Sequence, residues 1–199
     1  MSRFWRKSCA SERCTSVPGV ATQFQAGRQA FLVKDYVRAA ELFEKVAKAK
    51  ADYVSVSANF RQTIWSYLGR AQYGLRDLRA ARRSLERAMS ANDGDGIARL
   101  YFGLTLLREN YLPGTQETEA ALKALHSWIE QANASSPGAA LWDPQREIRR
   151  EIEKTLADIS NRAVNVENLI ASGEWIGERM EAEMDQVKRD ESRRFNNEF

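Results

Sequence analysis

Cysteine and histidine, which supply most zinc ligands and form the pairs of Cys–His catalysis, occur three times in the chain, as Cys9, Cys14 and His126. The two cysteines lie close together in a polar segment near the start of the chain, and the single histidine lies far from both. A structural zinc site needs four ligands, and a nucleophilic enzyme needs a nucleophile beside its base. An oxidising compartment would allow a disulfide between the cysteines, but two reduced thiols are the simpler interpretation. We therefore expect no enzyme, no metal site and no cofactor.

Arginine is the other residue type whose spacing indicates chemistry. Four arginines follow one another at spacings of three or four residues and form a basic stripe: Arg76, Arg79, Arg83 and Arg87. Arg82 lies beside this stripe. On a helix this spacing places the guanidinium groups on one side, where they could bind RNA, an acidic protein or lipid headgroups. A solvated face is the simpler interpretation, because Asp77 and Glu86 temper the charge and no aromatic residues are interleaved there.

The composition indicates an ordered globular chain that holds these residues in place. Its 199 residues are 43% hydrophobic and 29% charged, with a net charge of +3, which is too balanced to predict nucleic-acid binding by itself. No apolar stretch approaches the length of a membrane span. The basic first residues are not followed by the apolar segment of a signal peptide. We expect a cytoplasmic location, or a periplasmic or exported one if an upstream signal has been removed.

Helical patterns fill the segments between the turns. The four prolines lie in connectors, and between them apolar residues recur at spacings of three and four. Sustained alternation of apolar and polar residues, which would indicate strands, is missing. The sequence therefore predicts an all-α protein.

The helical region contains an internal repeat. When Gly27, Gly69 and Gly103 are aligned, their surroundings superpose. The second unit is the clearest, with Trp65, Leu68-Gly69, Asp77-Leu78, Ala81, Leu85 and Ala88; the first has Asp35-Tyr36, Ala39, Phe43 and Val46 at the same offsets; the third continues after an insertion at Pro113-Gly114-Thr115 with Ala121, Leu125 and Trp128. We expect the glycines and small alanines to lie where two helices cross closely.

This pattern resembles the tetratricopeptide repeat, with units at about 20–50, 54–92 and 96–134. Two positions depart from the signature, since Gln23 replaces the opening Trp of the first unit and Gln72 an aromatic residue of the second. The first two glycines are also eight residues further apart than the last two, which predicts a lengthened helix near Asp52–Asn59. The resemblance implies a short right-handed superhelix of antiparallel helix pairs.

In that family the first helix of each unit lines a concave groove that binds ligands. The matching positions combine aromatic rings with one arginine per unit: Phe24, Arg28 and Phe31; Tyr67, Arg70 and Tyr73; Tyr101, Leu104 and Arg108. The resemblance implies that these residues bind an extended or helical segment with apolar anchors and an acidic group. Alternatively, some of them are buried against the chain's own C-terminal helices. A clamp for a chaperone's C-terminal carboxylate is not expected, because only Arg28 suits one.

Residues 139–187 are expected to form a long helix and a short one packed on the repeats. Asp143 would cap the long helix, with Pro144 in its first turn, and Ser172-Gly173 would end it. Apolar residues from Ile152 to Ile170 form a narrow seam of coiled-coil type. The hairpin would cap the stack, with self-association through the seam or folding back into the groove as alternatives. Residues 1–19 and 188–199 are expected to be flexible, and the acidic residues near the C-terminus are interpreted as ordinary surface partners of Lys and Arg.

These observations favour a non-catalytic adaptor that binds a segment of another protein in the groove. One alternative is an assembly subunit that forms a homo-oligomer through the 152–170 seam. The other is an RNA or anionic-surface binder that uses the stripe from Arg76 to Arg87, although nucleic acid is the less expected partner.

Overall fold

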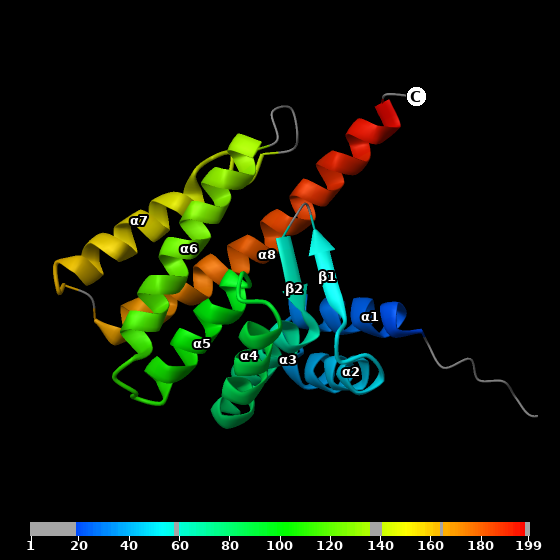
Figure 1. Cartoon of the computed structure of the whole chain (residues 1–199), viewed down its shortest axis with the longest axis horizontal. Coiled ribbons are helices and arrows are strands. Elements are labelled where there is room, and N and C mark those ends of the chain that lie inside the picture. Colours follow the sequence, from blue (N-terminus) through cyan, green and yellow to red (C-terminus); the bar gives the residue numbers. More distant parts are fainter. Residues whose placement is uncertain (1–18, 58–59, 136–140, 164, 198–199) are drawn as a thin grey trace, which may run out of the picture.

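Helices make up most of the computed structural model, which describes residues 19–57, 60–135, 141–163 and 165–197. The all-α prediction is confirmed at this level, with one short β-hairpin as the exception (Figure 1). In chain order the described elements are α1 (Val20–Leu32), α2 (Tyr36–Ala49), β1 (Val54–Ser57), β2 (Phe60–Thr63), α3 (Ile64–Gly74), α4 (Leu78–Ala91), α5 (Gly96–Arg108), α6 (Gly114–Ser135), α7 (Glu147–Ser160) and α8 (Val166–Asn197).

The first six helices pack in sequence, each against the next along the chain. The three aligned glycines lie where the helices of a pair cross, and a Cβ atom at any of them would collide with the partner helix. The distance from that Cβ would be 2.8 Å to Phe43 from Gly27, 2.6 Å to Leu85 from Gly69 and 2.5 Å to Thr118 from Gly103. The close crossings predicted at these glycines are therefore present.

The helices α2, α4 and α5 begin with the same local device. An aspartate side chain at the N-cap accepts a hydrogen bond from the amide three residues later, which satisfies one of the free donors of the first turn. The pairs are Asp35 with Arg38 N (3.2 Å), Asp77 with Ala80 N (3.1 Å) and Asp95 with Ala98 N (2.9 Å).

The prediction of a lengthened helix near Asp52–Asn59 is wrong, because this segment contributes to an antiparallel β-hairpin. The segment from Val54 to Ser57 alternates valine with serine, a short pattern that favours a strand. In the second strand Phe60 is buried against Trp128, with ring centroids 4.6 Å apart. This aromatic contact ties the hairpin to α6.

The C-terminal helices differ from the prediction in length. The expected long helix from 142 to 171 ends at Ser160, and α8 then runs through Ser172-Gly173 and through most of the segment expected to be flexible. The break falls at Arg162, whose φ of 54° is left-handed, and the side chain of Asn165 caps α8 by accepting from the amide of Glu167 at 2.7 Å. Gly173 lies inside α8 at a close approach to Leu104, where its lack of a side chain allows the contact.

Asp143 caps α7 from outside the helix and not as its first residue. The helix begins at Glu147, and the two carboxylate oxygens of Asp143 accept from the amides of Ile148 and Arg149, both at 3.0 Å. The capping role was predicted correctly, and the helix start was wrong. The loop after Pro144 delays the helix by one turn.

The apolar seam from Ile152 to Ile170 is divided between two helices. Ile152 on α7 is fully buried, whereas Val166 at the start of α8 is about half exposed. The prediction of a continuous seam on one helix is therefore wrong.

The N-terminal tail up to residue 18, with Cys9 and Cys14, lies outside the described residues.

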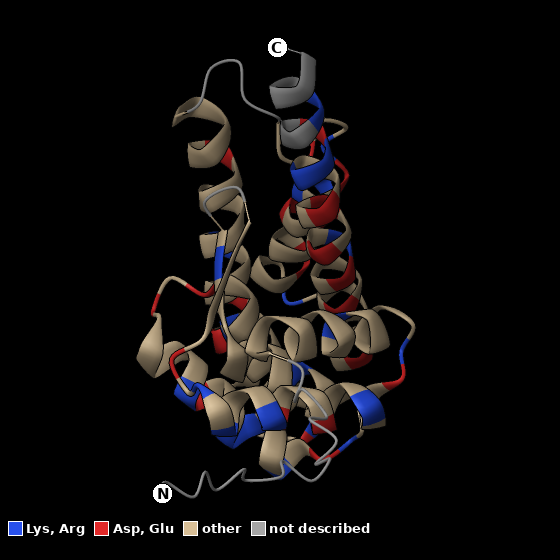
Figure 2. Ribbon diagram, turned by 90° about the vertical axis from the view of Figure 1, so that its right-hand side faces the viewer, with Lys and Arg blue, Asp and Glu red and all other residues tan. Residues whose placement is uncertain are grey.

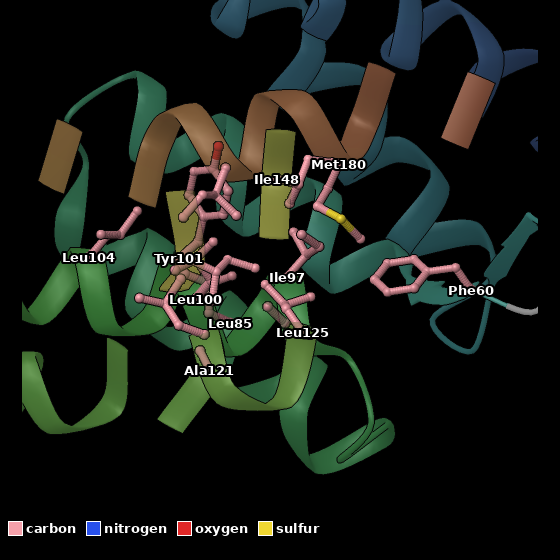
Figure 3. Close-up of a cluster of buried hydrophobic side chains, with 14 of the residues drawn as sticks. Phe60, Leu85, Ile97, Leu100, Tyr101, Leu104, Ala121, Leu125, Ile148 and Met180 are labelled. Atoms are coloured by element: carbon pink, nitrogen blue, oxygen red, sulfur yellow. The ribbon is translucent and has the colours of Figure 1, made fainter. Parts of the chain in front are cut away.

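The larger hydrophobic core joins α5 to the C-terminal helices. Figure 3 shows Ile97, Tyr101 and Leu104 of α5 in this cluster, together with Met180 of α8 and Ile148 of α7. A second, smaller cluster lies among α1, α2 and α3. As a result, α8 is part of the core and not an appendage.

Candidate functional site

The nine predicted groove residues lie on three helices, with three each on α1, α3 and α5. We refer to the surface formed by these helices as the α1–α3–α5 face. The C-terminal helix α8 packs on it and contacts α5 most extensively. The alternative in which the groove residues are buried against the chain's own C-terminal helices therefore describes most of this site.

An acidic row on α8 meets a basic row on the α1–α3–α5 face. The acidic residues are spaced by four, three and four, which places them on one side of the helix. Each forms an ion pair: Glu174 with Arg108, Glu178 with Lys34, Glu181 with Arg28 and Arg70, and Asp185 with Arg28. Figure 2 shows how acidic residues succeed one another along α8.

Glu181 is at the centre of this row and is 2% exposed. One of its oxygens accepts from Nε of Arg28 at 2.8 Å, and the other accepts from Nη1 of Arg70 at 2.9 Å. Arg28 also pairs with Asp185 at 2.7 Å. Burial by itself would lower the pKa of Arg28, but the bond to Asp185 and the charge of Glu181 raise that pKa above its ordinary value. Both arginines therefore stay charged in a nearly dry site.

Aromatic rings enclose the guanidinium group of Arg70, which is 1% exposed. Its Cζ atom lies 4.6 Å from the ring centre of Phe31, 5.3 Å from that of Tyr101 and 5.5 Å from that of Tyr67. These distances are within the range of cation–π attraction. Nε and Nη2 of Arg70 have no hydrogen-bond partner among the described residues. The rings thus fix the guanidinium in place and leave Nη1 to hold Glu181.

Glu174 forms the second polar contact between α8 and the α1–α3–α5 face, with residues of α3 and α5. The hydroxyl of Tyr73 donates to Oε1 of Glu174 at 2.6 Å, and Arg108 donates both to that hydroxyl and to the same carboxylate. Burial and the bond to Glu174 raise the pKa of the Tyr73 hydroxyl, which keeps it protonated. Tyr73 therefore serves as a donor that helps to orient α8.

Two glycines allow α8 to lie directly on α5. A Cβ atom at Gly173 would lie 2.6 Å from the side chain of Leu104, and one at Gly177 would lie 2.6 Å from the ring of Tyr101. Beside these glycines, α8 buries an apolar row made of Ile176, Met180, Met184 and Val187. The face therefore receives a helix with small residues at the crossing, apolar residues on one side and carboxylates on the other.

Six of the nine predicted residues contact α8 through the bonds and packing just described, and a seventh, Phe31, holds Arg70. The remaining two, Phe24 and Tyr67, pack against each other in the smaller core with their ring centres 4.9 Å apart, and Tyr67 also contributes to the enclosure of Arg70. Sequence reasoning missed Lys34 and the whole acidic row of α8. The spacing of the acidic residues was a usable signal, but they were interpreted as ordinary surface partners.

Little space remains beside α8 on this face. A hollow of about 190 Å³ lies between the α1–α2 turn and α8, with Lys34, Tyr36 and Glu178 among its lining residues. It has room for a side chain and not for a second helix. Any other helix would have to take the place of α8.

Comparison with known protein families, with curated proteins and with solved structures finds no match to the chain. Within the described ranges, no three His, Cys, Asp or Glu side chains come together in a way that could hold a metal ion. His126 lies on α6, and its Nε2 is 3.0 Å from Glu153 of α7. Over the same ranges no helix has both the length and the apolar character needed to cross a membrane.

Proposed function

We propose that the chain is a non-catalytic interaction adaptor whose α1–α3–α5 face binds one acidic amphipathic helix. The observation that carries the proposal is the buried carboxylate of Glu181, held by Arg28 and Arg70 from two different helices. Charge-assisted bonds of this kind give orientation as well as affinity. The tetratricopeptide-like organisation belongs to the same proposal, and the three equivalent glycine crossings support it.

In the free chain the occupant of the face is α8, which therefore defines the chemistry that a partner must match. A partner helix needs carboxylates at the spacing of Glu174, Glu178 and Glu181. It also needs small residues where it passes Tyr101 and Leu104, since α8 has glycine there. Because a tethered helix has an effective concentration in the millimolar range, such a partner competes with α8 and must bind more tightly.

The proposal is tested by exchange of α8 in a chain that has been cut after folding. A protease site is inserted in the turn between α7 and α8, at Asn161–Asn165, and the folded protein is cleaved there. A fluorescein-labelled peptide of residues 166–197 is then added, and its incorporation is followed by fluorescence anisotropy. We expect incorporation into the cleaved chain and exclusion from the uncut chain.

Two control peptides make the test specific. A peptide with Glu174→Gln and Glu181→Gln removes the charges that the face holds, and it should compete at least about tenfold less well. A peptide with Ala171→Gln and Ala182→Gln changes two exposed positions and should compete as well as the parent. If both control peptides compete equally, or if the labelled peptide never enters the cleaved chain, the face is not a receptor for acidic helices.

A further inference from the structure

A second surface lies on the opposite edge of α3, where α2 and α4 flank it. Trp65, Leu68 and Gln72 of α3 form the floor of a hollow of about 280 Å³, and residues of α2 and α4 form its sides. A neighbouring hollow of about 520 Å³ shares Trp65, Arg83 and Arg87 with the first. We call the surface around these two hollows the α2–α4 face. None of its residues takes part in the bonds to α8 described above, so α8 leaves this face uncovered.

Arginines whose charges no described residue neutralises lie on or beside the α2–α4 face: Arg83 and Arg87 line both hollows, and Arg79 precedes them by one turn of α4. Among the described residues, Arg79, Arg83 and Arg87 form no ion pair, whereas the nearby Glu44 pairs with Lys48 and Glu86 pairs with Arg82. The three arginines lie four residues apart along α4, so their guanidinium groups recur about every 6 Å. Open cations in a row beside a hollow are suited to an anionic partner.

Trp65 is held by a hydrogen bond and in turn restricts Arg87, the last arginine of the row. Its indole nitrogen donates to the carbonyl of Ala51 at 2.9 Å, and the guanidinium of Arg87 lies 4.8 Å from the ring centre. Stacking on a ring held in this way restricts the arginine without neutralising its charge. Gln72, where the repeat signature has an aromatic residue, accepts from Ser84 at 2.7 Å and lines the hollow.

We propose that the α2–α4 face binds an acidic segment of a partner protein, with Arg79, Arg83 and Arg87 pairing with successive carboxylates. An extended segment with an acidic residue at every second position repeats at about 6.6 Å, which is close to the spacing of the arginines. Nucleic acid is less suited to this face, because Arg87 covers the indole that could stack with a base.

The probe for this surface is a fluorescein-labelled twelve-residue peptide of alternating glutamate and glycine, with a glutamine version as its control. Binding to the full chain is measured by anisotropy at low and at physiological salt. We expect the glutamate peptide to bind, the glutamine peptide not to bind, and the affinity to fall as salt rises. Equal binding of the glutamate and the glutamine peptide to the full chain at low salt would overturn the proposal.

Variants locate the binding on the chain. Arg79→Glu with Arg83→Glu changes two exposed side chains that form no hydrogen bond or ion pair with the described residues, and it should weaken binding at least about tenfold. Arg38→Glu with Arg61→Glu makes the same change in net charge at exposed positions away from the hollows, and it should have a much smaller effect. Equal loss in the two variants would show a general charge effect and overturn the site.

Two further arms separate this surface from its alternatives. Tighter binding of a twelve-nucleotide single-stranded RNA, lost in the Arg79 and Arg83 variant, would replace the acidic segment by nucleic acid. Glu181→Gln weakens the hold on α8 and leaves the α2–α4 face unchanged, so the affinity for the glutamate peptide should stay within about twofold of the parent. Clearly tighter peptide binding in that variant would place the probe on the α1–α3–α5 face, in competition with α8, and would contradict the second site.

Discussion

Arg70 of α3 and Glu181 of α8 form a buried ion pair at 2.9 Å, although 111 residues separate them in the chain. Their side chains are 1% and 3% exposed. Taking two charges out of water costs several kcal/mol, and that cost is offset only when every charge is well paired. Arg28 provides the second partner of Glu181, and three aromatic rings enclose Arg70. The pair therefore fixes where α8 lies on the α1–α3–α5 face.

Loss of the Glu181 charge should destabilise the fold strongly. Glu181→Gln leaves Arg70 buried without a carboxylate, and we expect the free energy of unfolding to fall by about 3 kcal/mol or more. Glu178→Gln on the same helix breaks an exposed pair with Lys34 and should cost about 1 kcal/mol or less. Urea denaturation followed by circular dichroism measures both. Equal costs in the two variants would mean that Glu181 is not held as described.

Two opposite exchanges on α8 should both destabilise the chain. Helix propensity alone predicts that Gly177→Ala stabilises and Ala182→Gly destabilises, each by about 1 kcal/mol. The methyl group added at Gly177 would meet the ring of Tyr101, so we expect Gly177→Ala to lower the free energy of unfolding by about 1–3 kcal/mol. Ala182 is exposed, so Ala182→Gly should follow helix propensity. Thermal and urea unfolding report the signs. A stabilised Gly177→Ala would show that α8 does not lie against Tyr101.

Asp95 should make stability depend on pH. Burial raises the pKa of its carboxyl from 3.8 to about 6, against the effect of the hydrogen bond from the amide of Ala98. Between these values the folded chain binds more protons than the unfolded chain, so the contribution of Asp95 to stability falls as the pH rises from about 4 to 6. Asp95→Asn removes the titration, and its stability relative to the parent should therefore increase over this range, by up to about 3 kcal/mol. A relative stability that does not change with pH would contradict the raised pKa.

Asp143 should be needed for the start of α7. Asp143→Ala removes the acceptor for two amides of the first turn and one partner of the buried Arg149 side chain, so we expect a loss of about 2–4 kcal/mol. Asp93→Ala is the control: it changes an exposed turn residue whose side chain forms no hydrogen bond or ion pair with the described residues, and it should change stability by less than about 0.5 kcal/mol. Amide hydrogen exchange along α7 adds a local readout. Unchanged protection there would mean that Asp143 does not cap the helix.

The helix pairs were predictable from the sequence because their determinants are local. One close crossing is marked by Gly69 and Leu85, which lie within a short stretch of sequence. The start of α4 is marked by Asp77, four residues before Ala81. The β-hairpin was missed because Val54–Ser57 is too short for its alternation to stand out, and its stability comes from the contact of Phe60 with a distant tryptophan. Its neighbours in the chain carry no sign of that contact.

The candidate site was predictable on one side only. The basic and aromatic residues of α1, α3 and α5 follow from the repeat register, but the acidic row of α8 is spread over a helix whose place is set by contacts distant in sequence. Glu174 and Glu181 therefore look like solvated residues until Arg108 and Arg70 are placed beside them. The end of α7 was missed for a similar reason, because the left-handed turn at Arg162 involves neither glycine nor proline.

The most direct test of the account is a double-mutant cycle between Arg70 and Glu181. The free energy of unfolding is measured for Arg70→Leu, Glu181→Leu and the double variant, with Lys34→Leu and Glu178→Leu as an exposed pair for comparison. Glu181→Leu leaves the buried charge of Arg70 unpaired, and Arg70→Leu leaves Glu181 with Arg28 as its one remaining partner. The cost of the double variant should therefore be lower than the sum of the two single costs by about 2 kcal/mol or more. Additive costs within about 0.5 kcal/mol would contradict the placement of α8 on the α1–α3–α5 face.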